Sequence, residues 1–157
     1  MQPISDSDRF HSRKNPRMKE FDYSSPYYYF LTLCTCNKEC IFGTEKDRSP
    51  RGKIAEACLA EIDRHFPNVK ADKSVVMPNH VHMILALRGE NPGVPYIVAA
   101  YKAAVTRMIH KTEPRRKVWQ ASFHDHVIRS QADYERIWLY IEANPRNWEK
   151  DCFFEAK

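Results

Sequence analysis

The chain has 157 residues, of which 43% are hydrophobic and 29% are charged, and its formal net charge is +5. This length fits one domain that can bury a core without disulfide staples. No run of about 18 apolar residues occurs, which excludes a transmembrane helix, and the first residues lack the apolar segment of a secretory signal. We therefore expect a soluble cytosolic protein.

The first part of the chain divides into an arm, a strand and a helix. Residues 1–25 are rich in Ser, Asp, Pro and basic side chains without periodicity, and predict a flexible basic arm. We expect one folded domain over residues 26–150. Its aromatic-rich run 27–36 is typical of a central strand. Residues 49–66 carry apolar side chains at helical spacing and predict a helix.

Two strands and a second helix are expected next. Residues 69–77 and 80–87 predict strands, and the Pro-Asn pair at 78–79 between them predicts the turn of a hairpin. Residues 94–111 follow a Gly-rich and Pro-rich loop and again have helical periodicity.

The last elements complete a recognisable order. A fourth strand is expected around residues 123–128, and residues 131–144 predict a helix that ends at Pro145. The order β-α-β-β-α-β-α is typical of the split βαβ, ferredoxin-like α+β fold, with one helix appended at the C-terminal end. In such a fold we expect helices on one face of the sheet and a free opposite face.

The pair His80 and His82 is the first feature that points to chemistry. Residues two apart in a strand project to the same face, so both imidazoles would lie side by side, whereas Val81 faces the core. Two neutral imidazoles can bind a divalent metal. A polar strand face with two hydrogen-bonded histidines has the same pattern, and the motif alone favours that interpretation.

A second candidate group lies on the appended helix. Tyr140 and Asn144 are four residues apart and therefore share a helical face. They could face the two histidines if this helix packs beside the third strand. Tyr134 and Tyr101 are competing phenols, and the spacing alone fits a core aromatic at position 140 as well as it fits a nucleophile.

The cysteines do not indicate a metal site or a disulfide framework. Their number is five, which is odd, and the chain has no export signal. Cys34, Cys36 and Cys40 are not followed by a second pair that would complete a four-ligand zinc site. We expect them to be small, buried, hydrophobic side chains.

Positive charge gathers after the second helix. Between residues 102 and 117 a single acid, Glu113, stands against six cations, which are Lys102, Arg107, Lys111, Arg115, Arg116 and Lys117. Such a cluster often only solvates a helix. It is also the electrostatic pattern of a protein that binds a phosphate backbone.

Taken together, these stretches resemble one family, the single-tyrosine HUH transposases, and within it the REP-associated tyrosine transposases. The resemblance extends from about Tyr23 to Trp148, over most of the chain. The matching stretches occur in the family's order and cover residues 29–32, 39–43, 75–82, 102–107, 118–120, 123–129 and 140–145.

The resemblance implies a metal-dependent endonuclease and strand transferase that acts on single-stranded DNA. His80 and His82 would be two metal ligands and Asn144 the third, where relatives often have Gln. Tyr140 would be the nucleophile that leaves a 5′-phosphotyrosine and a free 3′-hydroxyl. The expected cofactor is Mg²⁺ or Mn²⁺.

The resemblance also implies the partners. The DNA would be cleaved near a palindromic hairpin, and the protein would be a monomer or a homodimer in the cytoplasm, associated with the nucleoid and not with a membrane. The residues expected to contact DNA are Lys102, Arg107, Arg115, Arg116, Lys117 and Arg129.

Two other functions remain open from the sequence. One is a domesticated module that binds hairpin DNA without cutting it. The other is a zinc hydrolase built on His80 and His82 together with His124 or His126, which would leave Tyr140 and Asn144 without a role.

Overall fold

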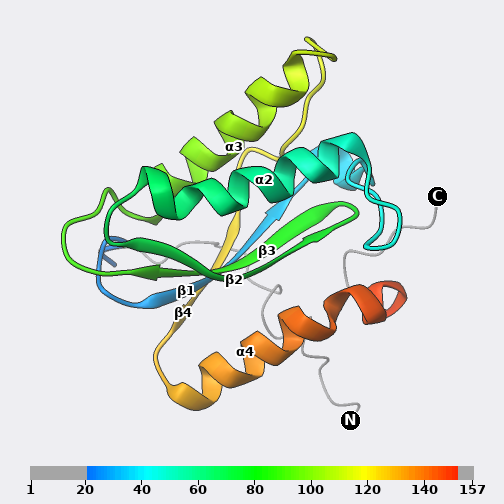
Figure 1. Cartoon of the computed structure of the whole chain (residues 1–157). Helices are drawn as coiled ribbons and strands as arrows, with labels where there is room; N and C mark the ends of the chain where they lie inside the picture. The colour runs from blue at the N-terminus through cyan, green and yellow to red at the C-terminus, as the bar shows by residue number, and fades with distance from the viewer. Residues whose placement is uncertain (1–20, 152–157) are drawn as a thin grey trace.

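The computed structural model describes residues 21–151, and it has α+β architecture, as expected (Figure 1). In this range four strands form one antiparallel sheet in the order β2-β3-β1-β4, with bounds β1 Tyr28–Cys34, β2 Val69–Met77, β3 His80–Leu87 and β4 His124–Ile128. The helices are α2 Pro50–His65, α3 Val94–His110 and α4 Gln131–Ala143, and two short 3-10 segments are η1 Cys36–Lys38 and η2 Asn144–Lys150. Within residues 21–151 no helix combines the length and the apolar character needed to cross a membrane.

Local chemistry fixes the element boundaries close to the expected ones. The strands β2 and β3 coincide with the predicted ranges, and each helix differs from its prediction by one residue at most at either end. The helix α2 begins after Ser49, whose hydroxyl accepts a hydrogen bond from the Gly52 amide, and Pro50 occupies the first helical position. Ser130 caps α4 in the same way, through the Asp133 amide.

One face of the sheet packs against α2 and α3 (Figure 1). Alternate residues of the two central strands point into this layer, because side chains of a strand alternate between its faces. The side chains that they contribute are Tyr29, Leu31, Leu33, Val81, Met83 and Leu85, and all six are buried. Val81 therefore faces the core, and the two histidines on either side of it face the opposite way.

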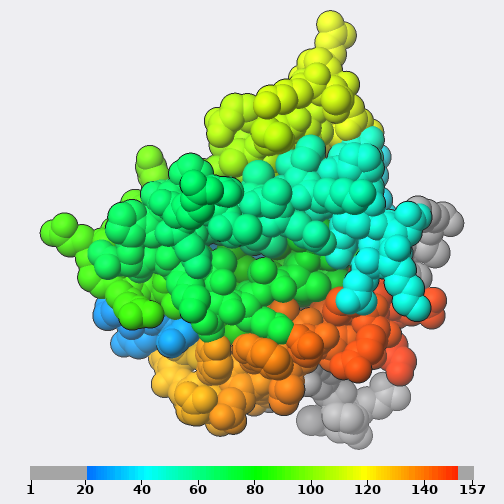
Figure 2. Space-filling model, in the orientation of Figure 1, coloured from blue at the N-terminus to red at the C-terminus, as the bar shows by residue number. Residues whose placement is uncertain are grey.

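The expectation that the opposite face is free is wrong. A smaller apolar cluster covers part of it, in which Ile137 and Ile141 of α4 pack against Phe30 of β1 and Ile84 of β3. The two isoleucines are four residues apart, so they form an apolar stripe that has to be buried. Figure 2 shows α4 and η2, in orange and red, lying directly against the green surface of β2. As a result, every residue of β3 is buried.

The predicted basic arm lies mostly outside the described residues, which begin at residue 21. Its last five residues, 21–25, are described and belong to the folded part. Phe21 and Tyr23 pack against the larger core, and the Val94 amide donates a hydrogen bond to the Tyr23 carbonyl.

The attachment of α4 to the sheet can be tested through Ile137, which is completely buried. Ile137→Ala should lower the free energy of unfolding by about 2–5 kcal/mol, because it leaves a cavity between α4 and the sheet. The control is Leu139→Ala on the same helix, since Leu139 is 63% exposed, and this change should stay within about 0.5 kcal/mol. Urea denaturation measures both. Equal losses in the two variants would contradict the packing described here.

Candidate metal centre and tyrosine

The two histidines of β3 converge on one point. His80 and His82 are completely buried, on the sheet face that α4 and η2 cover. Their Nε2 atoms lie 3.1 Å apart. The two rings therefore do not line a solvated face of the strand.

A hydrogen bond fixes which ring nitrogen of His80 carries the proton. The Asn79 side chain donates its Nδ2 to the Lys38 carbonyl at 3.2 Å, which leaves Asn79 Oδ1 to face His80 Nδ1 at 2.8 Å. An amide oxygen only accepts, so neutral His80 must carry its proton on Nδ1. Its Nε2 then presents a lone pair, as a metal ligand requires.

His82 is held in a similar way by the neighbouring strand. Thr32 lies opposite His82 in the register of β1 and β3, and its Oγ1 is 2.9 Å from His82 Nδ1. A hydroxyl can accept as well as donate, so this contact is compatible with the tautomer in which His82 Nε2 carries the lone pair that a metal ligand needs. Both imidazoles are therefore oriented by polar partners behind them, as in metal-ligating histidines generally.

A carboxylate, Asp151, completes the group. Its Oδ2 lies 3.9 Å from His80 Nε2. Within the described residues these three side chains form the one group of potential metal ligands, with ligand atoms all within 4.8 Å of one another. Asp151 was not among the residues predicted from the sequence, and it lies one residue beyond the range 26–150 expected for the domain.

The segment η2 brings Asp151 to the histidines. Asn147 has non-helical backbone angles inside η2, and the Asp151 amide donates to the Trp148 carbonyl. The Trp148 ring lies 6.0 Å from the His80 ring, centroid to centroid. Because the segment bends after Pro145, helical spacing from Tyr140 could not have predicted where Asp151 lies. The one feature of the sequence that could have indicated Asp151 is that an acidic residue follows the candidate helix within a few residues.

Tyr140 of α4 meets the same group, and Asn144, the first residue of η2, lines a pocket with Tyr140 and Asp151. The Tyr140 hydroxyl lies 3.5 Å from Asp151 Oδ2, at the outer limit of a hydrogen bond, and its ring lies 5.5 Å from the His82 ring. Asn144 is buried and donates its Nδ2 to the Tyr140 carbonyl, and its Oδ1 has no hydrogen-bond partner within the described residues. A buried amide oxygen without a donor is suited to a cation.

These side chains open onto a pocket. Its volume is about 420 Å³, and Tyr140, Asn144 and Asp151 line it together with the basic residues Arg136 and Lys150. A ligand that enters this pocket would meet a phenol, an amide oxygen, a carboxylate and two cations. Two imidazole nitrogens and two oxygens form a ligand set that is compatible with a divalent cation.

The competing tyrosines lie elsewhere. The Tyr134 hydroxyl donates to Asp72, and burial, with that hydrogen bond, raises the pKa of Tyr134 to about 12. The Tyr101 hydroxyl donates to the Ala55 carbonyl in the larger core, and burial raises the pKa of Tyr101 well above its ordinary value. Of the three phenols considered, Tyr140 is the one beside the histidines.

The second His-x-His pair does not join this group. His124 lies opposite Thr32 on the far side of β1 from His82, so the two histidines are two strand spacings apart, or about 9.5 Å. His126 contacts Asp133 at 2.7 Å. The ligand group of the described residues includes neither. This arrangement does not support a three-histidine zinc site.

The six predicted DNA-binding cations divide into two sets. Two are held by the protein itself: Lys102 Nζ donates to the carbonyls of Gln120 and Ser122, and Arg116 bonds to Glu39 and Glu113. The other four are exposed and are Arg107, Arg115, Lys117 and Arg129.

Comparison with known proteins identifies the family. The family model described as "Transposase IS200 like" matches residues 23–144, which is most of the chain. This chain belongs to the IS200-like transposases. The resemblance predicted from the sequence is therefore confirmed at the level of the family.

Three similar proteins illustrate the relationship. One from Haemophilus influenzae, without an assigned function, is 32% identical over 169 residues and covers 92% of this IS200-like chain and 94% of its own length. Another from Haemophilus influenzae, named provisionally as a REP-associated tyrosine transposase, is 23% identical and covers 79% of this chain and 73% of its own. A solved REP-associated tyrosine transposase bound to a REP hairpin superposes with a TM-score of 0.66 at 19% identity, over 86% of this chain and 74% of that one.

The orientation of His80 in this IS200-like chain can be tested by NMR. In a long-range ¹H–¹⁵N spectrum of the metal-free protein at alkaline pH, the His80 proton should be on Nδ1, because Asn79 Oδ1 only accepts. His110 is an internal control with the opposite expectation, since its Nε2 donates to the Arg116 carbonyl. A proton on His80 Nε2 in the same spectrum would contradict the ligand geometry.

Proposed function

We propose that this chain is a metal-dependent endonuclease and strand transferase that cleaves single-stranded DNA near palindromic hairpins. Tyr140 is the nucleophile in this proposal, and His80, His82 and Asp151 hold the metal, with Asn144 as a further oxygen ligand. The solved relative that was captured with a REP hairpin supports the choice of DNA.

The observation that carries the proposal is the meeting of a tyrosine with a buried ligand group. The Tyr140 hydroxyl lies 3.5 Å from the same Asp151 oxygen that approaches His80. A structural tyrosine has no need for a carboxylate at its hydroxyl and a buried imidazole pair beside its ring. A nucleophile that attacks a phosphodiester does, because charge develops on the phosphate oxygens during the attack.

The proposed attack of Tyr140 on the DNA strand requires no reactant other than the DNA itself. The Tyr140 oxygen forms a bond to phosphorus, and the bond between phosphorus and the 3′ oxygen breaks. The phenol loses its proton, and the departing 3′ oxygen gains one and becomes a hydroxyl. The phosphotyrosine preserves a phosphodiester-like bond, so a 3′-hydroxyl can attack it and join two strands.

The protein's own groups prepare this step. Asn79 and Thr32 hold the imidazoles so that their Nε2 atoms lie 3.1 Å apart. Arg136 and Lys150 add positive charge at the wall of the pocket that Tyr140, Asn144 and Asp151 line. A bound Mg²⁺ or Mn²⁺ would polarise the phosphate oxygens as a Lewis acid. Asp151 would offset one of its two charges, a contribution that Asn144 alone could not make.

The arrangement favours a tyrosine that serves the histidines of its own chain. The Tyr140 ring packs against both His82 and Phe30, at centroid distances of 5.5 and 6.0 Å. Because all the proposed groups belong to one chain, a monomer would be competent for cleavage. Exchange of tyrosines between two copies would require α4 to leave the sheet.

The assignment of Tyr140 as the nucleophile is tested with Tyr→Phe variants, which remove the hydroxyl and keep the ring. Tyr140→Phe should abolish the covalent protein–DNA adduct with a single-stranded hairpin substrate, because the attacking oxygen is missing, while hairpin binding changes little. Tyr134→Phe, on the same helix, is the control and should retain adduct formation. Denaturing gel electrophoresis measures the adduct. If Tyr140→Phe still forms it, the assignment is wrong, and if the unaltered chain binds the hairpin without any adduct, the non-cleaving module is the better description.

The metal ligands are tested through affinity for Mn²⁺. Asp151→Asn should weaken Mn²⁺ binding at least about tenfold, because it removes a charged oxygen ligand. His80→Ala should weaken it similarly. Glu149→Gln is the matched control, since Glu149 is a nearby exposed acid. Electron paramagnetic resonance of free Mn²⁺ gives the dissociation constants. Unchanged binding in Asp151→Asn would leave Asn144 as the third ligand.

A further inference from the structure

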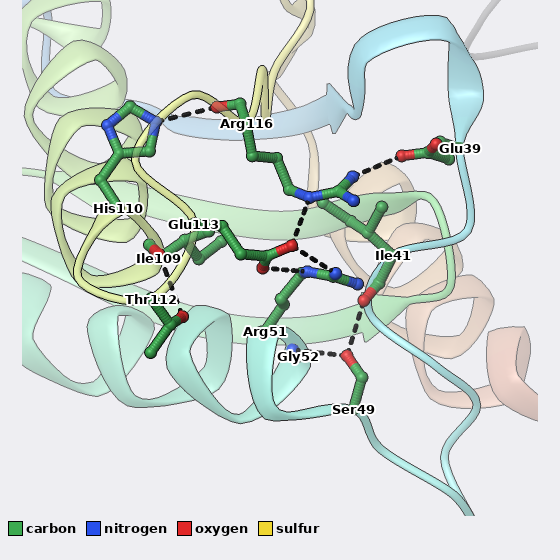
Figure 3. A network of polar contacts seen from close by, with 10 residues as sticks. All are labelled: Glu39, Ile41, Ser49, Arg51, Gly52, Ile109, His110, Thr112, Glu113 and Arg116. Carbon is green, nitrogen blue, oxygen red and sulfur yellow. Dashed lines mark hydrogen bonds and ion pairs between the residues drawn. The ribbon is translucent and has the colours of Figure 1, made fainter.

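A network of charged side chains holds the loop that follows α3 (Figure 3). Glu113, at the start of this loop, accepts two hydrogen bonds from Arg51 of α2, at 2.7 and 2.6 Å, and one from Arg116 at 2.8 Å. Arg116 also donates to Glu39, beside η1, at 2.7 Å. The hydrogen bonds from Arg51 and Arg116 lower the pKa of Glu113 to about 2. The network therefore stays charged throughout the physiological pH range.

Backbone contacts fix the loop at both of its ends. The Glu113 amide donates to the Ile109 carbonyl, and His110 Nε2 donates to the Arg116 carbonyl at 2.8 Å. Beyond the loop, the Cys36 amide donates to the Val118 carbonyl. The loop is thus anchored to α3 on one side and to the start of η1 on the other.

The anchored loop faces η1 across the largest pocket described here, of about 620 Å³. Arg115 and Lys117 line it and are exposed, and no carboxylate of residues 21–151 forms an ion pair with either. Three cations and two carboxylates line it, namely Arg115, Arg116 and Lys117 against Glu39 and Glu113. Arg51 adds a further positive charge behind Glu113, to which it donates two hydrogen bonds. The pocket therefore carries a net positive charge, although two acids are built into its wall.

We propose that this pocket, with the loop Glu113–Lys117 as its wall, binds the phosphate backbone of the base-paired stem of the DNA hairpin. The inference rests on the proposed function and adds the place where the stem docks. The two acids serve to position Arg116 and the loop, and they leave Arg115 and Lys117 for the ligand.

A duplex suits this site better than an unpaired strand. The loop is held at fixed points, so its two exposed cations project from fixed backbone positions. A rigid ligand loses little entropy when it binds to such a preorganised site. Duplex DNA also carries a denser array of phosphates than a single strand, and it releases more counterions for each contact.

A continuous set of hydrogen bonds joins this site to the metal centre. Glu39 bonds to Arg116 on one side, and its carbonyl lies 2.8 Å from Thr35 Oγ1. Thr35 Oγ1 is also 3.0 Å from the Asn79 carbonyl, and Asn79 is the residue that orients His80. A stem bound at the loop would therefore lie at a defined position relative to the histidines.

The test compares two pairs of neutralised cations. Phosphate contacts do not depend on sequence, so any stable DNA stem-loop is a suitable probe. Arg115→Gln with Lys117→Gln should weaken stem-loop binding, and the slope of log affinity against log salt should fall by about 1.8, or 0.9 for each lost phosphate contact. Lys70→Gln with Arg88→Gln is the control, because both residues are exposed and lie at the opposite end of β2 and β3 from His80. Fluorescence anisotropy measures the affinities.

The outcomes separate this inference from the proposed function. The inference is overturned if the Arg115 and Lys117 pair binds the stem-loop like the unaltered chain, if the control pair loses as much, or if an unpaired oligonucleotide is affected as strongly as the stem-loop. Adduct formation by Tyr140 on a single-stranded substrate is measured in parallel. Loss of stem binding with adduct chemistry preserved supports the docking site, and absence of adduct in the unaltered chain contradicts the proposed function alone.

Discussion

Two imidazole rings buried side by side need a polar partner at each nitrogen, and this requirement governs the site. The register of β1 and β3 sets Thr32 opposite His82, and the hairpin turn sets Asn79 beside His80. Both Nδ1 atoms are thereby satisfied from within the sheet. The Nε2 atoms are left facing each other at 3.1 Å, where α4 and η2 close over them with a carboxylate and a phenol.

Much of the fold could be read from the sequence, because its signals are local. Alternation and turn residues located the hairpin of β2 and β3, and helical spacing put Tyr140 and Asn144 on one face of α4. The covered sheet face was missed, although Ile137 and Ile141 form the stripe that covers it. An apolar stripe indicates that a helix is buried, but which surface it meets depends on the loop that precedes it.

The position of Asp151 beside the histidines could not be predicted from the sequence, for a different physical reason. Its place depends on a bend after Pro145 and on the contact of Trp148 with His80, and neither has a periodic signature. The cations show the same limit. Six basic side chains looked equivalent in the sequence, but the fold uses Lys102 and Arg116 as internal hydrogen-bond donors, because carbonyl and carboxylate groups that are distant in the chain lie within their reach.

The late position of α4 and η2 in the chain has a consequence for synthesis. The histidines leave the ribosome long before Tyr140, Asn144 and Asp151, and domains acquire long-range contacts only when the participating segments are available. An unfinished chain can form the hairpin that carries the histidines, but it holds neither the tyrosine nor the carboxylate that completes the site. A fragment released early would therefore lack the phenol and the carboxylate that the proposed reaction requires, so the order of these residues in the chain would limit when that reaction becomes possible.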